Sequence, residues 1–217
     1  MRSSPWKQRD CSTARGYDRD VRTWVTTVAV VLSAAASGAM KIDLGPGDVG
    51  RALEIARSRE SDRAKFHAAY IQKVDAPFVE SVELVTEFRR VVLLAEERAA
   101  KGDRLFGYSI TSASDALNVW RRRLSVIARV RFHPQNNYVT VPPVNIAADG
   151  HDGSLIGVQR EAVYALGARA EQAAPLFGAV VDGVFDALAL GQGTREFIVS
   201  LDGKEFGRAT FSLAAVE

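Results

Sequence analysis

The sequence predicts an α+β protein in which a helical N-terminal part packs on an antiparallel, β-sandwich-like C-terminal part. Before residue 122, apolar residues recur at steps of three and four, which is the period of an amphipathic helix. From Leu124 onward they recur at every second position, which is the period of a strand with one buried face. Helices followed by strands, without regular alternation, indicate an α+β arrangement.

Four helices are expected in the N-terminal part, at residues 48–56, 61–69, 77–100 and 114–121. The helix over 77–100 has the strongest pattern, because valine and phenylalanine recur along one face. Pro77 suits its first turn, and Gly102 is the expected stop.

Strands are expected at residues 124–133, 138–146, 155–166, 179–185, 196–201 and 204–213. Pro142-Pro143 inside the second range indicates an edge strand or a bulge. Asp202-Gly203 between two apolar runs favours a type I′ hairpin turn. Residues 176–190 fit both a helix and a strand, and their β-rich surroundings favour a strand followed by a helical turn over 186–190.

Residues 1–39 are predicted to be a leader with an export signal. A basic flank, a short apolar stretch at 24–36 and small residues up to Ala39 follow in the order that signal peptides show. We expect cleavage after Ala39, or alternatively after Ala36, and a periplasmic or secreted location. The polar stretch before Val21 is unusual for a signal peptide. Two explanations are open: translation starts at Val21, or the stretch is a disordered extension.

Removing the leader changes the charge and the cysteine content. Six of the 28 basic and three of the 26 acidic residues lie before residue 40, so 22 and 23 remain and the net charge is about −1. Cys11, the only cysteine, leaves with the leader, so disulfides and thiol chemistry are not expected. A nearly neutral chain argues against nucleic acid as a partner. No membrane span and no polybasic or amphipathic membrane-surface segment is expected in the mature chain.

The mature chain is predicted to form one compact unit of two lobes. The first is a helical lobe at 40–122, and the second is a β-rich lobe at 123–217.

One short motif matches a nucleotide-binding pattern by its letters. Residues 45–50 spell G-x-G-x-x-G after a short strand-like run, and residues 70–74 could form a second strand that ends at Asp75. The first strand would be only about three residues long, and alternating strands and helices do not continue. The favoured interpretation is a glycine-rich entry to a helix with Asp48 as its N-cap.

The candidate binding residues lie at the end of the 124–133 strand: Arg129, Arg131, His133, Asn136, Asn137 and Tyr138. The first three alternate, so a strand would place them on one face about 7 Å apart. Guanidinium, imidazole and amide groups could together hold a carboxylate, a phosphate or a sugar. The structural alternative is a solvated sheet face with an ordinary turn, or pairing of the arginines with acids of the long helix, such as Glu87 or Glu96.

No cofactor, metal or catalytic residue is predicted. The three histidines show no ligand spacing, and the polar loop at 149–153 does not match a calcium loop. Neither a nucleophile motif nor a zinc-protease motif is present. The first functional hypothesis is therefore an exported, non-catalytic binding or interaction module of the bacterial envelope. The alternative is a small-ligand binder or hydrolytic enzyme whose site contains Arg129, Arg131, His133 and Asn136, with a small polar ligand instead of a protein partner.

Overall fold

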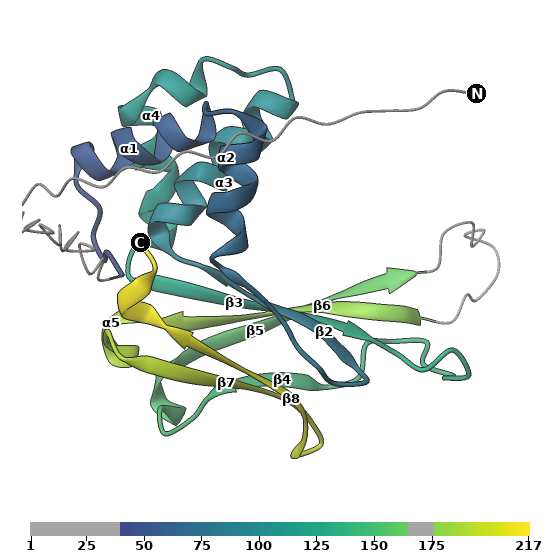
Figure 1. Cartoon of the computed structure of the whole chain (residues 1–217). Coiled ribbons are helices and arrows are strands. Elements are labelled where there is room, and N and C mark those ends of the chain that lie inside the picture. Colours follow the sequence, from purple (N-terminus) through teal and green to yellow (C-terminus); the bar gives the residue numbers. More distant parts are fainter. Residues whose placement is uncertain (1–39, 165–175) are drawn as a thin grey trace, which may run out of the picture. The chain divides into compact units, whose positions relative to one another are not determined.

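The computed structural model describes residues 40–164 and 176–217, which belong to one compact unit of the chain. The predicted signal segment and its cleavage site at Ala39 lie outside the described residues. Within the described residues, five α-helices and eight strands in two antiparallel sheets form a mixed α+β fold (Figure 1). The fold class predicted from the sequence is therefore confirmed.

The helices are α1 (Pro46–Ala56), α2 (Glu60–Ala68), α3 (Glu87–Ala100), α4 (Ile110–Leu117) and α5 (Ala187–Leu190). Helices α1, α3 and α4 surround an apolar core in which Leu53, Phe88 and Leu117 are buried. Phe66 of α2 packs against this core and also against the core of the sheets. Its ring therefore joins the helical part of the fold to the β part.

The larger sheet has the strand order β1 (Ile71–Lys73), β2 (Val79–Val85), β3 (Arg123–Arg131), β6 (Leu176–Asp186) and β5 (Leu155–Tyr164). The smaller sheet has the order β4 (Val144–Ala148), β7 (Thr194–Leu201) and β8 (Lys204–Ser212). The two sheets share one apolar core, to which β3 contributes Val126 and β7 contributes Val199. The β-sandwich-like description therefore holds for the strands.

Side chains connect the two sheets along both of their edges. On one side, the Gln72 amide of β1 donates to the carbonyl oxygen of Thr210 in β8 and accepts from the Thr210 N–H at 3.1 Å. On the other side, the Arg160 guanidinium of β5 donates to the Val144 carbonyl at 2.7 Å and to the Asn145 side chain at 2.6 Å. Groups that an open sheet edge would leave unpaired are thereby used within the fold.

The prediction of one helix over 77–100 is wrong for its first third. Residues 79–85 form β2, and Thr86 caps α3 by accepting a hydrogen bond from the Arg89 N–H at 3.2 Å. Val82 and Val85 are spaced like helix neighbours, but β-branched residues also suit a strand. Pairing of β2 with β1 and β3 decides between the two structures. From Glu87 onward the helix is as predicted.

Other predicted boundaries also change. The α1 N-cap is Gly45, whereas Asp48 lies at the third helical position and accepts from the Gly45 N–H at 3.3 Å. The Lys41 ammonium beside Asp48 lowers the pKa of that carboxyl. Residues 45–50 thus begin a helix in a fold whose sheets are antiparallel, and no parallel nucleotide-binding sheet forms among the described strands.

The last predicted helix starts earlier than expected, since α4 is capped by Ser109 and residues 118–120 form a 3₁₀ turn. The strand expected over 138–146 begins only at Val144, after Pro142-Pro143, because proline cannot donate to a ladder. β4 is nevertheless an edge strand, as the two prolines predicted.

Two local predictions are confirmed in detail. Asp202 and Gly203 both have positive φ, 49° and 75°, as a type I′ turn between β7 and β8 requires. The ambiguous stretch forms strand β6 followed by the short helix α5, which Asp186 caps through the Leu188 N–H at 2.8 Å. Gly178 permits close packing here, since a Cβ would lie 2.2 Å from the Val130 carbonyl oxygen.

Candidate functional site

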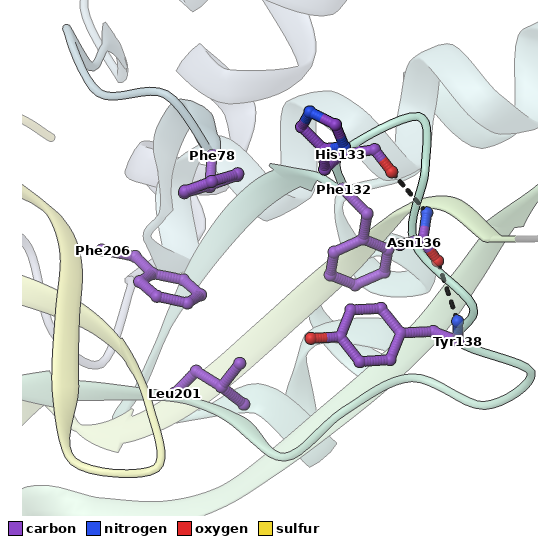
Figure 2. A pocket seen from close by; sticks show the side chains of 7 residues that line it. All are labelled: Phe78, Phe132, His133, Asn136, Tyr138, Leu201 and Phe206. Carbon is purple, nitrogen blue, oxygen red and sulfur yellow. Dashed lines mark hydrogen bonds between the residues drawn. The ribbon is translucent and has the colours of Figure 1, made fainter.

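A pocket of about 180 Å³ opens at the end of the sheets where the β7–β8 hairpin meets the loop after β3. Three of the predicted binding residues, His133, Asn136 and Tyr138, lie in its wall (Figure 2). The other lining residues are Phe78, Phe132, Leu201 and Phe206. The lining is therefore mainly aromatic and apolar, with an imidazole, an amide and a phenol among the rings.

The loop after β3 has its shape because Asn136 holds it. The Asn136 side-chain nitrogen donates to the carbonyl oxygens of His133 at 2.7 Å and Leu176 at 3.0 Å. Its side-chain oxygen accepts from the Tyr138 N–H at 2.9 Å. Both ends of the amide are thus used by the backbone, so Asn136 positions the pocket wall instead of offering hydrogen bonds to a ligand.

The aromatic rings form two pairs on opposite sides of the pocket. Phe132 and Tyr138 meet edge to face with ring centres 5.2 Å apart, and Phe78 and Phe206 lie 5.5 Å apart. Figure 2 shows the gap between the pairs, with the Tyr138 hydroxyl directed toward Leu201 and Phe206. Rings held in this way give a flat ligand group two apolar walls.

Two residues of the pocket wall, His133 and Tyr138, carry a polar side-chain group that can donate a hydrogen bond. The His133 Nδ1 accepts a hydrogen bond from the Gln135 N–H at 3.1 Å, so the neutral ring carries its hydrogen on Nε2. The Tyr138 hydroxyl is the second group. Both can donate a hydrogen bond, which suits an oxygen or a π face on the ligand.

The remaining predicted site residues lie outside this pocket. Arg131 forms an ion pair with Glu80 and stacks over the Phe177 ring, with its guanidinium carbon 5.4 Å from the ring centre. Arg129 is exposed on the outer face of the larger sheet, and Asn137 is exposed in the loop. The structure therefore does not bring the two arginines together with His133, because the strand ends at Arg131 and Phe132 turns into the core.

Sequence reasoning missed the apolar half of the site. The alternation over 124–133 predicts only that Phe132 is buried, and the sequence indicates no binding role for Phe78, Leu201 or Phe206. The Asp202-Gly203 turn predicts that Leu201 and Phe206 lie close together, at the tip of one hairpin. Nothing in the local sequence indicates that this tip meets Phe78 and Tyr138, because the two sheets pack through tertiary contacts.

A second polar cluster lies under Trp120, between α3 and the larger sheet. The Arg90 guanidinium stacks 3.7 Å from the Trp120 ring centre and donates to the Ser125 hydroxyl at 2.7 Å. Burial lowers the pKa of Arg90 to about 10, and burial also raises the pKa of Asp182. Arg90 Nε and Asp182 Oδ1 are both buried without a hydrogen-bond partner within the described part of the chain. Both atoms are shielded from solvent, so neither is exposed to a ligand.

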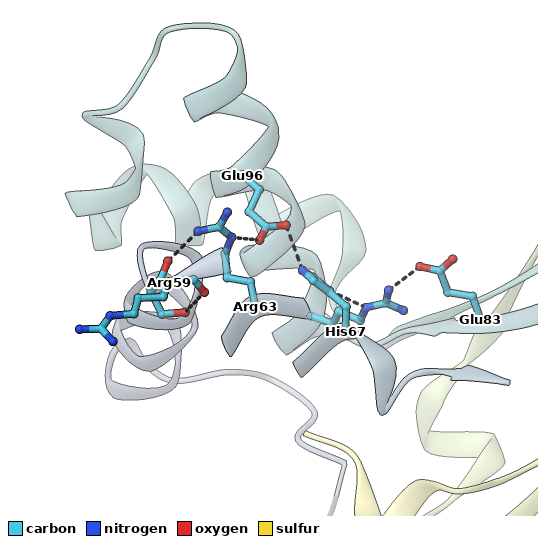
Figure 3. A network of polar contacts seen from close by, with 7 residues as sticks. Arg59, Arg63, His67, Glu83 and Glu96 are labelled. Carbon is cyan, nitrogen blue, oxygen red and sulfur yellow. Dashed lines mark hydrogen bonds and ion pairs between the residues drawn. The ribbon is translucent and has the colours of Figure 1, made fainter. Parts of the chain in front are cut away.

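A third polar network joins the helices to β2 (Figure 3). His67 Nε2 lies 3.0 Å from Glu96, and its Nδ1 accepts from Arg89 Nε at 3.4 Å. Arg63 pairs with the same Glu96 at 2.9 Å, and Arg89 pairs with Glu83. Each charged group is matched within the network, which is typical of a structural connection.

Two findings concern metals and membranes. Within residues 40–164 and 176–217, no three His, Cys, Asp or Glu side chains gather closely enough to hold a metal ion. In the same residues, the helices are all too short or too polar to cross a bilayer.

Fold and pocket together define an α+β protein with two antiparallel sheets around one core and an aromatic pocket at one end. Comparison with known proteins gave no match, whether to a family model, a curated protein or a solved structure.

Proposed function

We propose that the protein is an exported, non-catalytic binding module that holds an aromatic side chain of a polypeptide partner in its pocket. One observation carries this proposal: four aromatic rings and a leucine line a pocket that is open at the surface. Phe78 and Tyr138 are still 36% and 37% exposed, so apolar surface remains there for a partner to cover.

The size of the pocket supports this choice of ligand. Apolar cavities of about 150 Å³ accept benzene. A volume of about 180 Å³ therefore suits one phenyl, phenol or indole group better than a sugar or a nucleotide. The His133 and Tyr138 donors would favour a ring with a polar substituent or an adjacent carbonyl oxygen.

The chemistry of the wall favours binding over hydrolysis. The seven lining residues include no carboxylate, serine or cysteine that could act as a nucleophile or pair with His133. Arg129 and Arg131, which a small anionic ligand would need, point elsewhere. The second candidate function is a small-ligand binder, and the pocket supports it only if the small ligand is aromatic.

Export is the part of the proposal that rests on the sequence alone. The order of basic flank, apolar stretch and small residues up to Ala39 supports it. When the full gene is expressed in a bacterial host, N-terminal sequencing of the protein outside the cytoplasm should start at Met40. Finding only the uncleaved chain inside the cells would contradict export, and would leave the pocket proposal unaffected.

We expect indole and N-acetyl-tryptophanamide each to raise the melting temperature of the full chain. At a probe concentration ten times the dissociation constant, the free energy of unfolding rises by about 1.4 kcal/mol, which raises the melting temperature by about 4 °C for a unit of this size. Leu201→Trp fills the pocket and should abolish the shift. The measurement is a thermal unfolding scan with each probe.

Leu188→Trp is the matched control, since Leu188 is exposed on α5 and is not a lining residue. It should keep the full shift. A shift with free indole but not with the amide would favour a small-molecule ligand over a polypeptide. No shift with either probe, or an equal shift in the Leu201 variant, would show that the pocket is not the binding site.

A further inference from the structure

Large apolar side chains stand out from the surface between α3 and α4. Leu105 is 81% exposed and Tyr108 is 70% exposed. Ile110, the first residue of α4, is 42% exposed. We call these three residues the apolar loop. Three large apolar side chains are thus exposed within six positions of one connection, and apolar side chains exposed close together mark contact surfaces.

The apolar loop is rigid because the residues between its members are anchored. Phe106 is buried in the helical core, and its N–H donates to the Asp103 carboxylate at 3.2 Å. Arg57 Nη1 donates to the Gly107 carbonyl at 2.6 Å, which fixes the 3₁₀ turn over Phe106–Tyr108. The backbone that carries Leu105 and Tyr108 is thus anchored before any partner binds, so little backbone ordering entropy is lost on binding.

Basic residues surround the apolar loop. The Arg57 guanidinium lies 4.3 Å from the Tyr108 ring centre, and that of Arg98 lies 5.5 Å from the Phe106 ring centre. Arg104 directly precedes Leu105 and is exposed. Residues 97–110 together with Arg57 contain four basic and two acidic residues. Of the two acids, Glu97 pairs with Lys101 and Asp103 caps the turn, so the rim is positively charged.

We propose that the apolar loop binds the surface of an anionic lipid bilayer, with Leu105 and Tyr108 in the headgroup region and the surrounding arginines on lipid phosphates. Tyrosine is favoured at membrane interfaces, and arginine can place its charge at the headgroups while its stem stays in apolar surroundings. A bilayer accepts outward-pointing side chains without a matching pocket. The net positive charge of the rim matches an anionic surface.

The test uses a fluorescent label that reports only on its own position. Cys11 is the only cysteine, so Cys11→Ser with Leu105→Cys gives the full chain a single thiol for an environment-sensitive dye. With vesicles of mixed phosphatidylglycerol and phosphatidylcholine at low salt, the emission should shift to the blue and be quenched by lipid-borne quenchers. Vesicles of phosphatidylcholine alone should leave it unchanged. Adding Arg104→Glu should weaken binding about tenfold or more.

A label at Leu188 in the same Cys11→Ser background is the control. Leu188 is 55% exposed on α5, which Figure 1 places away from the α3–α4 connection. Its emission should not change, so attachment of the chain through residues 24–36 cannot imitate the result. A label at 105 that stays in water with both kinds of vesicle would overturn the proposal and point to a protein partner. An equal shift at 105 and 188 would overturn it as well.

Discussion

Replacing Glu87 with alanine should lower the free energy of unfolding by about 4 kcal/mol. Glu87 is only 3% exposed, and its carboxylate accepts three backbone N–H groups. Those of Asp43 and Leu44 lie at 3.3 Å, and the third belongs to Arg122. Alanine would leave these donors without an acceptor, and a buried unpaired donor costs about 1–3 kcal/mol.

Glu87 also supports two strained backbone positions. Asp43 and Arg122 both have φ of 59°, and their side chains pair at 2.9 Å. A positive φ at such residues persists only where the surroundings enforce it. Loss of the carboxylate should therefore release the chain before α1 and the turn before β3 together.

Urea unfolding followed by circular dichroism measures the Glu87 effect, and Glu60→Ala is its matched control. Glu60 is also the first residue of a helix, but it is exposed, so only its interaction with the helix dipole is lost, about 0.5 kcal/mol. Glu87→Gln should fall between wild type and Glu87→Ala, because one oxygen acceptor remains. Equal losses for Glu87→Ala and Glu60→Ala would show that the backbone contacts do not stabilise the fold.

Replacing Arg89 with methionine should cost about 4 kcal/mol. Arg89 is 2% exposed, donates to the Leu84 carbonyl and pairs with Glu83. Its guanidinium also lies 5.0 Å from the Tyr70 ring centre. Burial lowers the pKa of Arg89, and the Glu83 charge opposes that change. Methionine fills the space but leaves the Glu83 carboxylate without its partner in a nearly buried place.

A double variant separates the charge effect from the packing effect. Arg89→Met together with Glu83→Leu removes both charges, so the loss should fall to about 1–2 kcal/mol, because replacing a whole ion pair is far less costly than removing one partner. Arg98→Met, an exposed change in the same helix, should stay within about 0.5 kcal/mol. The variants Arg89→Met and Glu83→Leu are also measured singly. If their separate losses of stability add up to the loss of the double variant, the ion pair is not coupled and the interpretation is wrong.

The pocket shows how far local sequence information reaches toward a site. The sequence indicates His133, Asn136 and Tyr138, because polar residues gather after a well-patterned strand. Their roles differ from the predicted ones, since the Asn136 amide is used by the backbone and the pocket lining is mainly aromatic. The sequence does not indicate the apolar loop for a related reason: Leu105, Tyr108 and Ile110 are too few to show a helix or strand period, and only their exposure distinguishes them.

The sequence by itself determined the elements whose signals are local. The alternation in β3 and the Asp202-Gly203 turn each depend on backbone preferences within a few residues. Tertiary structure alone decided that residues 79–85 are a strand, because Val82 and Val85 suit either a helix or a sheet until β1 and β3 pair with them. It also decided where the pocket lies, since Phe78 and Phe206 are 128 positions apart and meet only when the two sheets bury their common core. Burial of apolar surface is non-directional, so the chain's local pattern shows which faces are buried but not which faces meet.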